Sequence, residues 1–260
     1  MFRRGITGAF HSSATEVKAA EEIPDLALAR MRQSMEKLGL SNQEFSDATL
    51  MRFLIARSMV VEKATEMIVK WREWREVLVP NGFISESEVA DELEARKIYL
   101  QGLTRRGHPL LIGKTCRHYP SVDKIQFKKF IAYVLDKTIA CSFRGQEVGN
   151  EKMVVLLDLK DISFKNVDPR GLITGFQFLQ SYYPEHLDRC YIVHMPVFFI
   201  SVWKFVSRFL DKATLEKIVI LTTEEEHEDL VEQIGDVLPE EYGGKAKLVA
   251  IQDVTLGSSL

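Results

Sequence analysis

The sequence predicts an α/β protein, in which a small helical domain precedes a sheet covered by helices. Apolar residues recur at helical spacing between residues 25 and 79. From about residue 95, short apolar runs alternate with amphipathic stretches, which is typical of strands alternating with helices. We therefore expect a flexible leader (1–24), a helical domain (25–79), an α/β domain (90–250) and a tail (251–260).

Three helices are expected in the helical domain. The first ends at Gly39, and Asp47 can cap the second. The third carries apolar residues up to Leu78, after which Pro80 and Gly82 break the pattern. The domain is therefore predicted to be a compact three-helix unit.

The α/β domain is expected to alternate strands and helices. Residues 153–159 form a continuous apolar run of the kind buried on both faces of a sheet. Thr223 and Glu226 form a capping box. The expected strands cover 108–113, 153–159, 191–195 and 217–221, and the expected helices cover 127–141, 170–181, 196–210 and 223–235.

The most unusual segment is the apolar stretch from Pro196 to Leu210. Only Ser201, Lys204, Ser207 and Arg208 interrupt its apolar side chains after Pro196. As a helix it would be roughly 20 Å long, too short for the roughly 30 Å core of a bilayer. We expect a helix that is buried all round or that meets an apolar partner.

Composition excludes several classes of function. The formal net charge of −3 argues against general nucleic-acid binding. Three widely spaced cysteines are typical of free thiols in a reducing compartment. The leader turns acidic by Glu16, which favours a cytosolic leader over an organelle-targeting peptide.

No motif for catalysis, a nucleotide or a metal is expected. Gly113, Lys114 and Thr115 resemble the end of a phosphate-binding loop, but His108 stands where glycine is required and the segment is predicted to be a strand. The four-residue spacing of His186, Cys190 and His194 falls across a loop and a strand, which favours packing over metal binding. The chain is therefore predicted not to be an enzyme.

Several motifs occur in a recognisable order. They are RFLIAR at 52–57, FLQSYYPEH at 178–186, YIVHM at 191–195, FLD at 209–211, KIVIL at 217–221 and LPEEYGG at 238–244. Together they resemble the CRAL-TRIO family of lipid-transfer proteins, typified by the secretory phosphatidylinositol/phosphatidylcholine exchange protein. The resemblance implies a three-helix unit followed by a mixed sheet that floors a deep apolar pocket for one lipid.

The resemblance also implies that the apolar helix is a gate over the pocket, whereas the physical alternative is an ordinary core helix. Lys204 and Arg208 can then rest on anionic headgroups. The pocket and gate residues it implies are Met153, Val155, Phe198, Phe199, Val202, Trp203, Val206 and Phe209.

Five headgroup residues follow from the resemblance alone. They are Arg57, Glu185, Asp211, Thr214 and Lys217. The position after the arginine, which is often lysine in the family, is Ser58. The two strand positions that hold hydroxyl groups in relatives binding phosphatidylcholine are Met153 and Val155, and residues 110–112 include no tyrosine.

The implied function is the uptake of phosphatidylinositol or a phosphoinositide and its exchange with membranes. A carrier of a neutral hydrophobe (a sterol, an isoprenoid or a tocopherol-like molecule) and a lipid-loaded sensor or adaptor are the alternatives. We expect a cytoplasmic monomer that contacts membrane surfaces transiently, binds no nucleic acid and needs no cofactor beyond the lipid.

Overall fold

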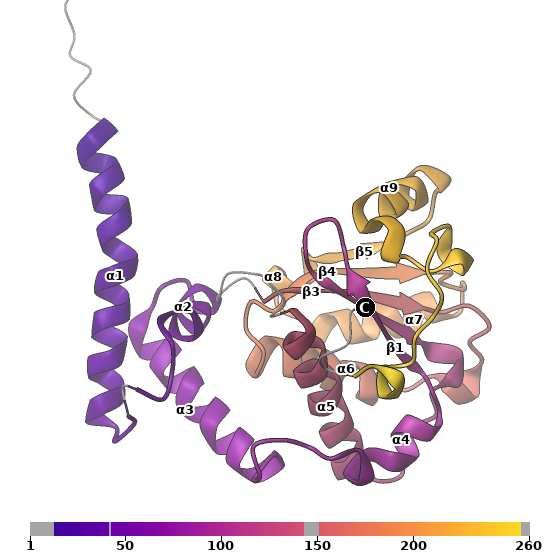
Figure 1. The fold of residues 1–260 in the computed structure, drawn as a ribbon, viewed down its shortest axis with the longest axis horizontal. Helices are drawn as coiled ribbons and strands as arrows, with labels where there is room; N and C mark the ends of the chain where they lie inside the picture. Colours follow the sequence, from indigo (N-terminus) through magenta and orange to yellow (C-terminus); the bar gives the residue numbers. More distant parts are fainter. Residues whose placement is uncertain (1–12, 42, 143–150, 256–260) are drawn as a thin grey trace, which may run out of the picture. The chain divides into compact units, whose positions relative to one another are not determined.

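The computed structural model describes residues 13–41, 43–142 and 151–255 (Figure 1). Contacts divide the chain after Val69 into an N-terminal and a C-terminal unit, each described by itself below. Helix α3 (Val61–Leu78) crosses this division. The division therefore falls inside the third predicted helix rather than after it.

The N-terminal unit contains α1 (Ser13–Lys37), α2 (Asp47–Ala56) and the first part of α3. Its core includes Met31, Met35 and Leu50, which are fully buried. Helix α1 begins within the expected leader, because residues 15–22 are rich in Ala, Glu and Lys, which favour helix.

The predicted cap of α2 is wrong by one residue. The Ser46 side chain, not that of Asp47, accepts a hydrogen bond from the Thr49 backbone N–H at 3.2 Å. Asp47 is the first helical residue and forms an ion pair with Arg32. A side chain one position before the helix is the one that reaches the third helical N–H.

The C-terminal unit is built on a five-stranded sheet in the order β1-β2-β3-β4-β5. β1 pairs antiparallel with β2, and the remaining pairs are parallel, so the sheet is mixed as expected. The strands are β1 (Ile98–Leu103), β2 (Pro109–Lys114), β3 (Met153–Asp158), β4 (Leu187–Val193) and β5 (Ile218–Ile220).

Two strands differ from the expectation. The sequence analysis missed β1, since Gln101 and Gly102 interrupt its apolar run. β4 begins at Leu187 rather than at Tyr191. Its start was not predicted, because the charged residues Asp188 and Arg189 interrupt the apolar pattern there. Gly113 lies inside β2 opposite Leu157, so the glycine–lysine–threonine segment is strand rather than a phosphate-binding turn, as predicted.

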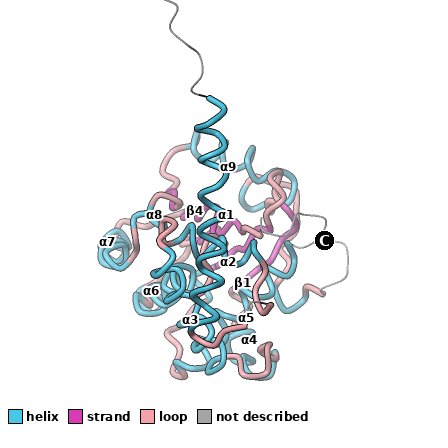
Figure 2. The backbone as a smooth tube through the Cα atoms, turned by 90° about the vertical axis from the view of Figure 1, so that its left-hand side faces the viewer, coloured by secondary structure: helices cyan, strands magenta, loops and turns pink. Residues whose placement is uncertain are grey.

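Helices cover both faces of the sheet. Figures 1 and 2 show α5, α6 and α7 on one side of the strands and α9 on the other. Met153 and Val155 pack in the core on the first side, and Val154 and Leu156 in the core on the second. The continuous apolar run is thus buried on both faces, as predicted.

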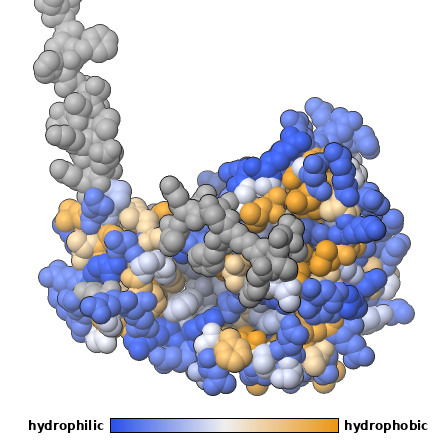
Figure 3. Space-filling view, viewed as in Figure 1, coloured by the Kyte–Doolittle hydropathy of each residue, from blue (hydrophilic) through white to orange (hydrophobic). Residues whose placement is uncertain are grey.

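Six α-helices of the described residues lie wholly within the C-terminal unit. They are α4 (Ala90–Glu94), α5 (Lys124–Ser142), α6 (Pro169–Ser181), α7 (Phe199–Val206), α8 (Lys212–Leu215) and α9 (Glu224–Ile234). None of the helices described is long and apolar enough to cross a membrane. Figure 3 shows a largely hydrophilic face, with a group of hydrophobic side chains over β4 and β5 next to α9.

Candidate functional site

An apolar cavity lies between the sheet and the helices α5, α6 and α7. Its volume is about 210 Å³. Strands β2 and β3 supply Leu111, Val155 and Leu157, and helix α5 supplies Phe130 and Val134. The other apolar side chains of its wall are Ile98, Phe127, Ile131, Leu135, Ile162, Leu172, Phe176, Leu179, Cys190 and Phe199.

The apolar stretch divides into two structures. Helix α7 ends at Val206, and a 3-10 turn at Ser207–Phe209 follows. The expectation of one helix from Pro196 to Leu210 is therefore wrong. The chain forms a turn before α7 begins. At the other end, the Ser207 hydroxyl donates to the Lys204 carbonyl at 3.3 Å, where the helix narrows to a 3-10 turn.

One face of α7 contacts the cavity and the core. Phe199 is 3% exposed and lines the cavity, and Val206 is fully buried. On the opposite face Ile200 and Phe205 are exposed, as are Lys204 and Arg208. α7 therefore presents apolar side chains both inward and to solvent, which is not the surface of an ordinary core helix.

The other pocket and gate residues occupy different positions. Val155 lines the cavity, whereas Met153 is fully buried in the core beside it. Phe198, Val202 and Trp203 are partly buried and pack against the core. Phe209 is 46% exposed, because it lies on the turn that follows α7.

Four of the headgroup residues lie in the C-terminal unit. The Lys217 ammonium lies 3.4 Å from the Glu185 carboxylate, and both side chains are about one-quarter exposed. The Asp211 side chain caps α8 by accepting from the Thr214 backbone N–H at 2.7 Å. The Thr214 carbonyl in turn accepts from the Lys217 N–H at 3.1 Å, so this turn holds the lysine backbone in place.

The fifth headgroup residue, Arg57, belongs to the N-terminal unit. It is the residue that ends α2, and its guanidinium donates to the carbonyl of Ala56 at 2.9 Å. The side chain is partly buried. Ser58 and Met59 follow with positive φ angles of 52° and 63°, which turns the chain away from the helix.

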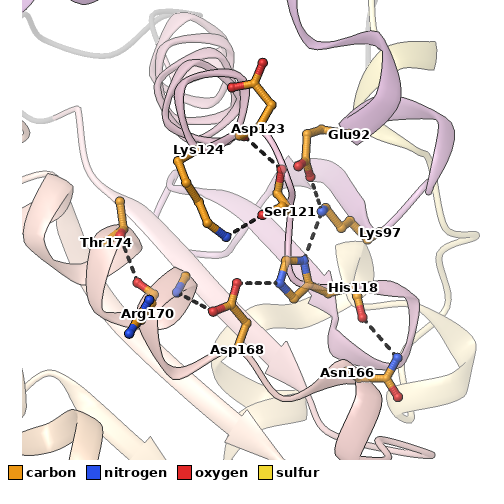
Figure 4. A network of polar contacts seen from close by, with 11 residues as sticks. Glu92, Lys97, His118, Ser121, Asp123, Lys124, Asn166, Asp168, Arg170 and Thr174 are labelled. Atoms are coloured by element: carbon orange, nitrogen blue, oxygen red, sulfur yellow. Dashed lines mark hydrogen bonds and ion pairs between the residues drawn. The ribbon is translucent and has the colours of Figure 1, made fainter.

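The sequence analysis missed a polar cluster in the cavity wall. Lys97 forms an ion pair with Glu92 and donates to His118 Nδ1 at 3.0 Å (Figure 4). His118 Nε2 lies 3.3 Å from Asp168, which caps α6 by accepting from the Gly171 N–H at 2.9 Å. No local motif predicts the cluster, because the residues that contact one another in it are separated by 5 to 50 positions in the sequence.

The surroundings of His118 determine its protonation state in this cluster. Burial, together with the Lys97 ammonium, lowers the pKa of His118 below its usual value despite Asp168. The ring is therefore neutral at pH 7, and it accepts from Lys97 at Nδ1 and donates to Asp168 from Nε2. Lys97, His118 and Asp168 all line the cavity.

The histidines and cysteines set aside by the sequence analysis have structural contacts. His194 Nδ1 lies 2.8 Å from Asp158, which also accepts from the Tyr242 hydroxyl at 2.8 Å. Burial raises the pKa of the Cys190 thiol to about 12, so the thiol is not reactive. Among the residues described, no three His, Cys, Asp or Glu side chains gather as a metal site would require.

Comparisons with known proteins identify the two parts of the chain. The model of the CRAL/TRIO domain matches residues 93–244, and that of the CRAL/TRIO N-terminal domain matches residues 14–70. A CRAL-TRIO domain-containing protein of Saccharomyces cerevisiae is 30% identical over 234 residues, which span 79% of this chain and 73% of that protein.

Two further similarities concern function and fold. A phosphatidylinositol/phosphatidylcholine transfer protein of Arabidopsis thaliana is 27% identical over 218 residues, covering 77% of this chain and 35% of that protein. The crystal structure of Sfh5 superposes with a TM-score of 0.65 at 19% identity, covering 90% of this chain and 92% of that one. The second similarity confirms the predicted fold.

Proposed function

The chain belongs to the CRAL/TRIO domain family, and on that basis we propose that it takes a phosphatidylinositol-type phospholipid into its cavity and exchanges it with membranes. The observation that carries the proposal is the position of α7. This helix contributes Phe199 to the wall of an apolar cavity and exposes Ile200 and Phe205 to solvent. The named activity of the Arabidopsis relative supports the same ligand class.

The size of the cavity supports a moving gate. Pockets for drug-sized ligands measure roughly 300 to 1,000 Å³. The cavity of about 210 Å³ is smaller, so a two-chain phospholipid requires the wall to open. Movement of α7 would exchange its core contacts for contacts with acyl chains, and each buried large side chain contributes about 1.5–3 kcal/mol in either state.

The headgroup is proposed to bind at Lys217 and Glu185 of the C-terminal unit. An ammonium attracts the phosphate, and the carboxylate accepts hydrogen bonds from inositol hydroxyls. Asp211 and Thr214 are proposed to support the site by holding the turn that carries Lys217, through the hydrogen bonds from the Thr214 N–H to Asp211 and from the Lys217 N–H to the Thr214 carbonyl. No catalytic step is part of this proposal.

We test the headgroup site with vesicle transfer of labelled phosphatidylinositol. Lys217→Ala should reduce the transfer rate by about tenfold, since a charge-assisted contact is lost. Lys129→Ala is the matched control, because Lys129 also forms a lysine–glutamate pair, with Glu88 at 2.6 Å, and is 23% exposed. Equal transfer by wild type and Lys217→Ala would refute the headgroup assignment.

A neutral hydrophobe remains the second candidate for the cargo. The sheet positions that would meet a choline headgroup are Met153 and Val155, and Met153 is fully buried. Native mass spectrometry of the purified protein distinguishes the two candidates, since the mass of a co-purified molecule identifies its class. A sterol or isoprenoid in place of a phospholipid would favour the second candidate.

We propose a cytoplasmic location with transient contact at membrane surfaces. Among the described residues, Cys116, Cys141 and Cys190 form no disulfide, which suits a reducing compartment. Exposed Lys204 and Arg208 lie beside the exposed apolar side chains of α7, and each cation near an anionic surface contributes about 1 kcal/mol. A monomer is proposed; a lipid-dependent pulldown would instead support the role of a sensor or adaptor.

A further inference from the structure

The cavity has one polar end, formed by side chains from four separate segments. Glu92 comes from α4, Lys97 directly precedes β1, His118 follows β2, and Asp168 caps α6 (Figure 4). Lys97 and Glu92 are 6% and 7% exposed at their side chains, and Asp168 is 10% exposed. Burying charges is costly unless each is paired, so their place in a lipid cavity requires an explanation.

Lys97 retains a hydrogen-bond donor on the cavity side. An ammonium has three N–H groups, and among the described residues its polar partners are Glu92 and His118. Its nitrogen also lies 5.1 Å from the ring centre of Phe130 and 5.6 Å from that of Phe127. Both rings and Lys97 line the cavity, so the remaining N–H is the one that an acceptor on a ligand would meet.

Asp168 retains hydrogen-bond acceptors. A carboxylate offers about four lone-pair sites. Among the described residues, Oδ1 accepts from the Gly171 N–H, and Oδ2 faces His118 at 3.3 Å. The polar end therefore offers a donor at Lys97 and an acceptor at Asp168, on either side of the His118 ring.

The charges at this end disfavour an anionic head. Lys97 carries one positive charge, Glu92 and Asp168 carry two negative charges, and the His118 ring is neutral. The other lysine of the cavity wall, Lys114, is paired with Glu241 at 2.7 Å. An anionic head would meet excess negative charge, whereas a cationic head would meet the Lys97 ammonium.

We propose that this cavity also binds an uncharged single-chain lipid with a hydroxyl-bearing head, such as a monoacylglycerol, with the head between Lys97 and Asp168. One hydroxyl oxygen of the head accepts from Lys97, and a hydroxyl donates to Asp168. The apolar wall takes the chain, and about 210 Å³ suits one chain better than two. This inference rests on the proposed function only in requiring that the cavity accept a lipid chain.

The test is calorimetric titration of the full chain with three ligands of equal chain length. These are 1-lauroylglycerol, methyl laurate (which cannot donate a hydrogen bond) and laurate (which is anionic). Wild-type protein should bind 1-lauroylglycerol about tenfold or more tightly than either of the others, because a hydrogen bond to a charged group is then made. Equal affinity for 1-lauroylglycerol and methyl laurate would overturn the proposal.

Variants assign the preference to the cluster. Lys97→Met/Glu92→Gln removes both charges of the pair together, so neither is left buried alone, and it should reduce the preference to less than about threefold. Lys129→Met/Glu88→Gln changes a lysine–glutamate pair that does not line the cavity, and it should keep the wild-type preference. An unchanged preference in the first variant would refute the assignment.

A single substitution keeps the test decisive if the double variant does not fold. Asp168→Asn retains an oxygen that can accept from Gly171 and should weaken 1-lauroylglycerol binding several-fold, with methyl laurate unchanged. Phosphatidylinositol transfer separates the two proposals. If the protein transfers phosphatidylinositol but shows no preference for 1-lauroylglycerol, only this inference is refuted. If it shows the preference but transfers no phosphatidylinositol, only the proposed cargo is refuted.

Discussion

Glu185 lies two residues before β4 with a φ angle of 60°, in the left-handed region that non-glycine residues seldom occupy. Its carboxylate faces Lys217 from this turn. Such backbone strain often occurs at functional sites, where surrounding structure maintains it. Among the proposed headgroup residues, Glu185 is the one with such a φ angle, in keeping with the binding role proposed for it.

The strain at Glu185 can be measured. Glu185→Ala and Glu185→Gly both lose the carboxylate, but only glycine adopts a φ angle of 60° without cost. We expect Glu185→Gly to be more stable than Glu185→Ala by about 1 kcal/mol, after allowing for the greater freedom of glycine in the unfolded chain. Denaturant unfolding gives this difference, and equal stability would show that the turn is unstrained.

The His118 ring should make stability depend on pH. Because its pKa in the fold is lowered, the neutral ring is favoured when Lys97, Glu92 and Asp168 surround it. This contribution is complete above the unfolded value of about 6.5 and is lost as the pH falls through the lower folded value. Wild type should therefore lose more stability than His118→Asn on acidification below pH 6.5.

The melting temperature measured between pH 7 and pH 5 checks this prediction. His227→Asn, on α9 and outside the cavity wall, is the control and should follow the wild-type curve. Parallel curves for wild type and His118→Asn would mean that the buried ring does not influence folding in this range.

At the scale of single elements, α7 carries large apolar side chains on both its buried and its exposed surface. Phe199 and Val206 are buried, and Phe205 and Phe209 are 47% and 46% exposed, with ring centres 5.2 Å apart. A neighbouring pair of exposed rings can insert into a membrane surface together. The inner surface contributes Phe199 to the cavity wall, and the outer surface is proposed to dock on membranes.

The outer surface can be tested without disturbing the cavity wall. Phe205→Ser/Phe209→Ser should reduce co-sedimentation with anionic vesicles about tenfold or more, because two large apolar side chains no longer leave water. Val77→Ser/Phe83→Ser removes side chains that are 83% and 65% exposed on α3 and the loop after it. This control should bind vesicles as wild type does; equal losses would argue against a specific docking helix.

At the scale of the molecule, the chain consists of two compact units, and the cavity belongs wholly to the second. A ligand that binds only the folded C-terminal unit stabilises that unit by mass action. At a free concentration of 100 times Kd the gain is about 2.7 kcal/mol. For a unit of this size, that corresponds to a rise in melting temperature of about 5–10 °C.

Scanning calorimetry with and without 1-lauroylglycerol measures this gain. The transition of the C-terminal unit should move upward, and that of the N-terminal unit should not. With phosphatidylinositol the transition of the C-terminal unit should also move upward, since Lys217 and Glu185 are proposed to bind the headgroup. No shift of that transition with phosphatidylinositol would argue against the proposed cargo.

The sequence by itself determined the elements whose signals are local. The capping box formed as predicted, with Glu226 N–H donating to the Thr223 hydroxyl at 3.2 Å and the Thr223 N–H donating back at 3.0 Å. The apolar run of β3 is buried on both faces, because alternate side chains point to opposite sides of a strand. The apolar stretch after Met195 was recognised as unusual, although α7 is shorter than expected.

Only the tertiary structure decided which polar groups meet. Asp168 is followed by the proline at the start of α6 and has the sequence signature of a helix cap, and Lys97 and His118 have no local signature at all. Folding brings them to one end of the cavity, where hydrogen bonds and burial make them a unit. Hydrophobic periodicity is a pattern among residues that are close in sequence, whereas a binding site depends on side chains that are distant in sequence and close in space.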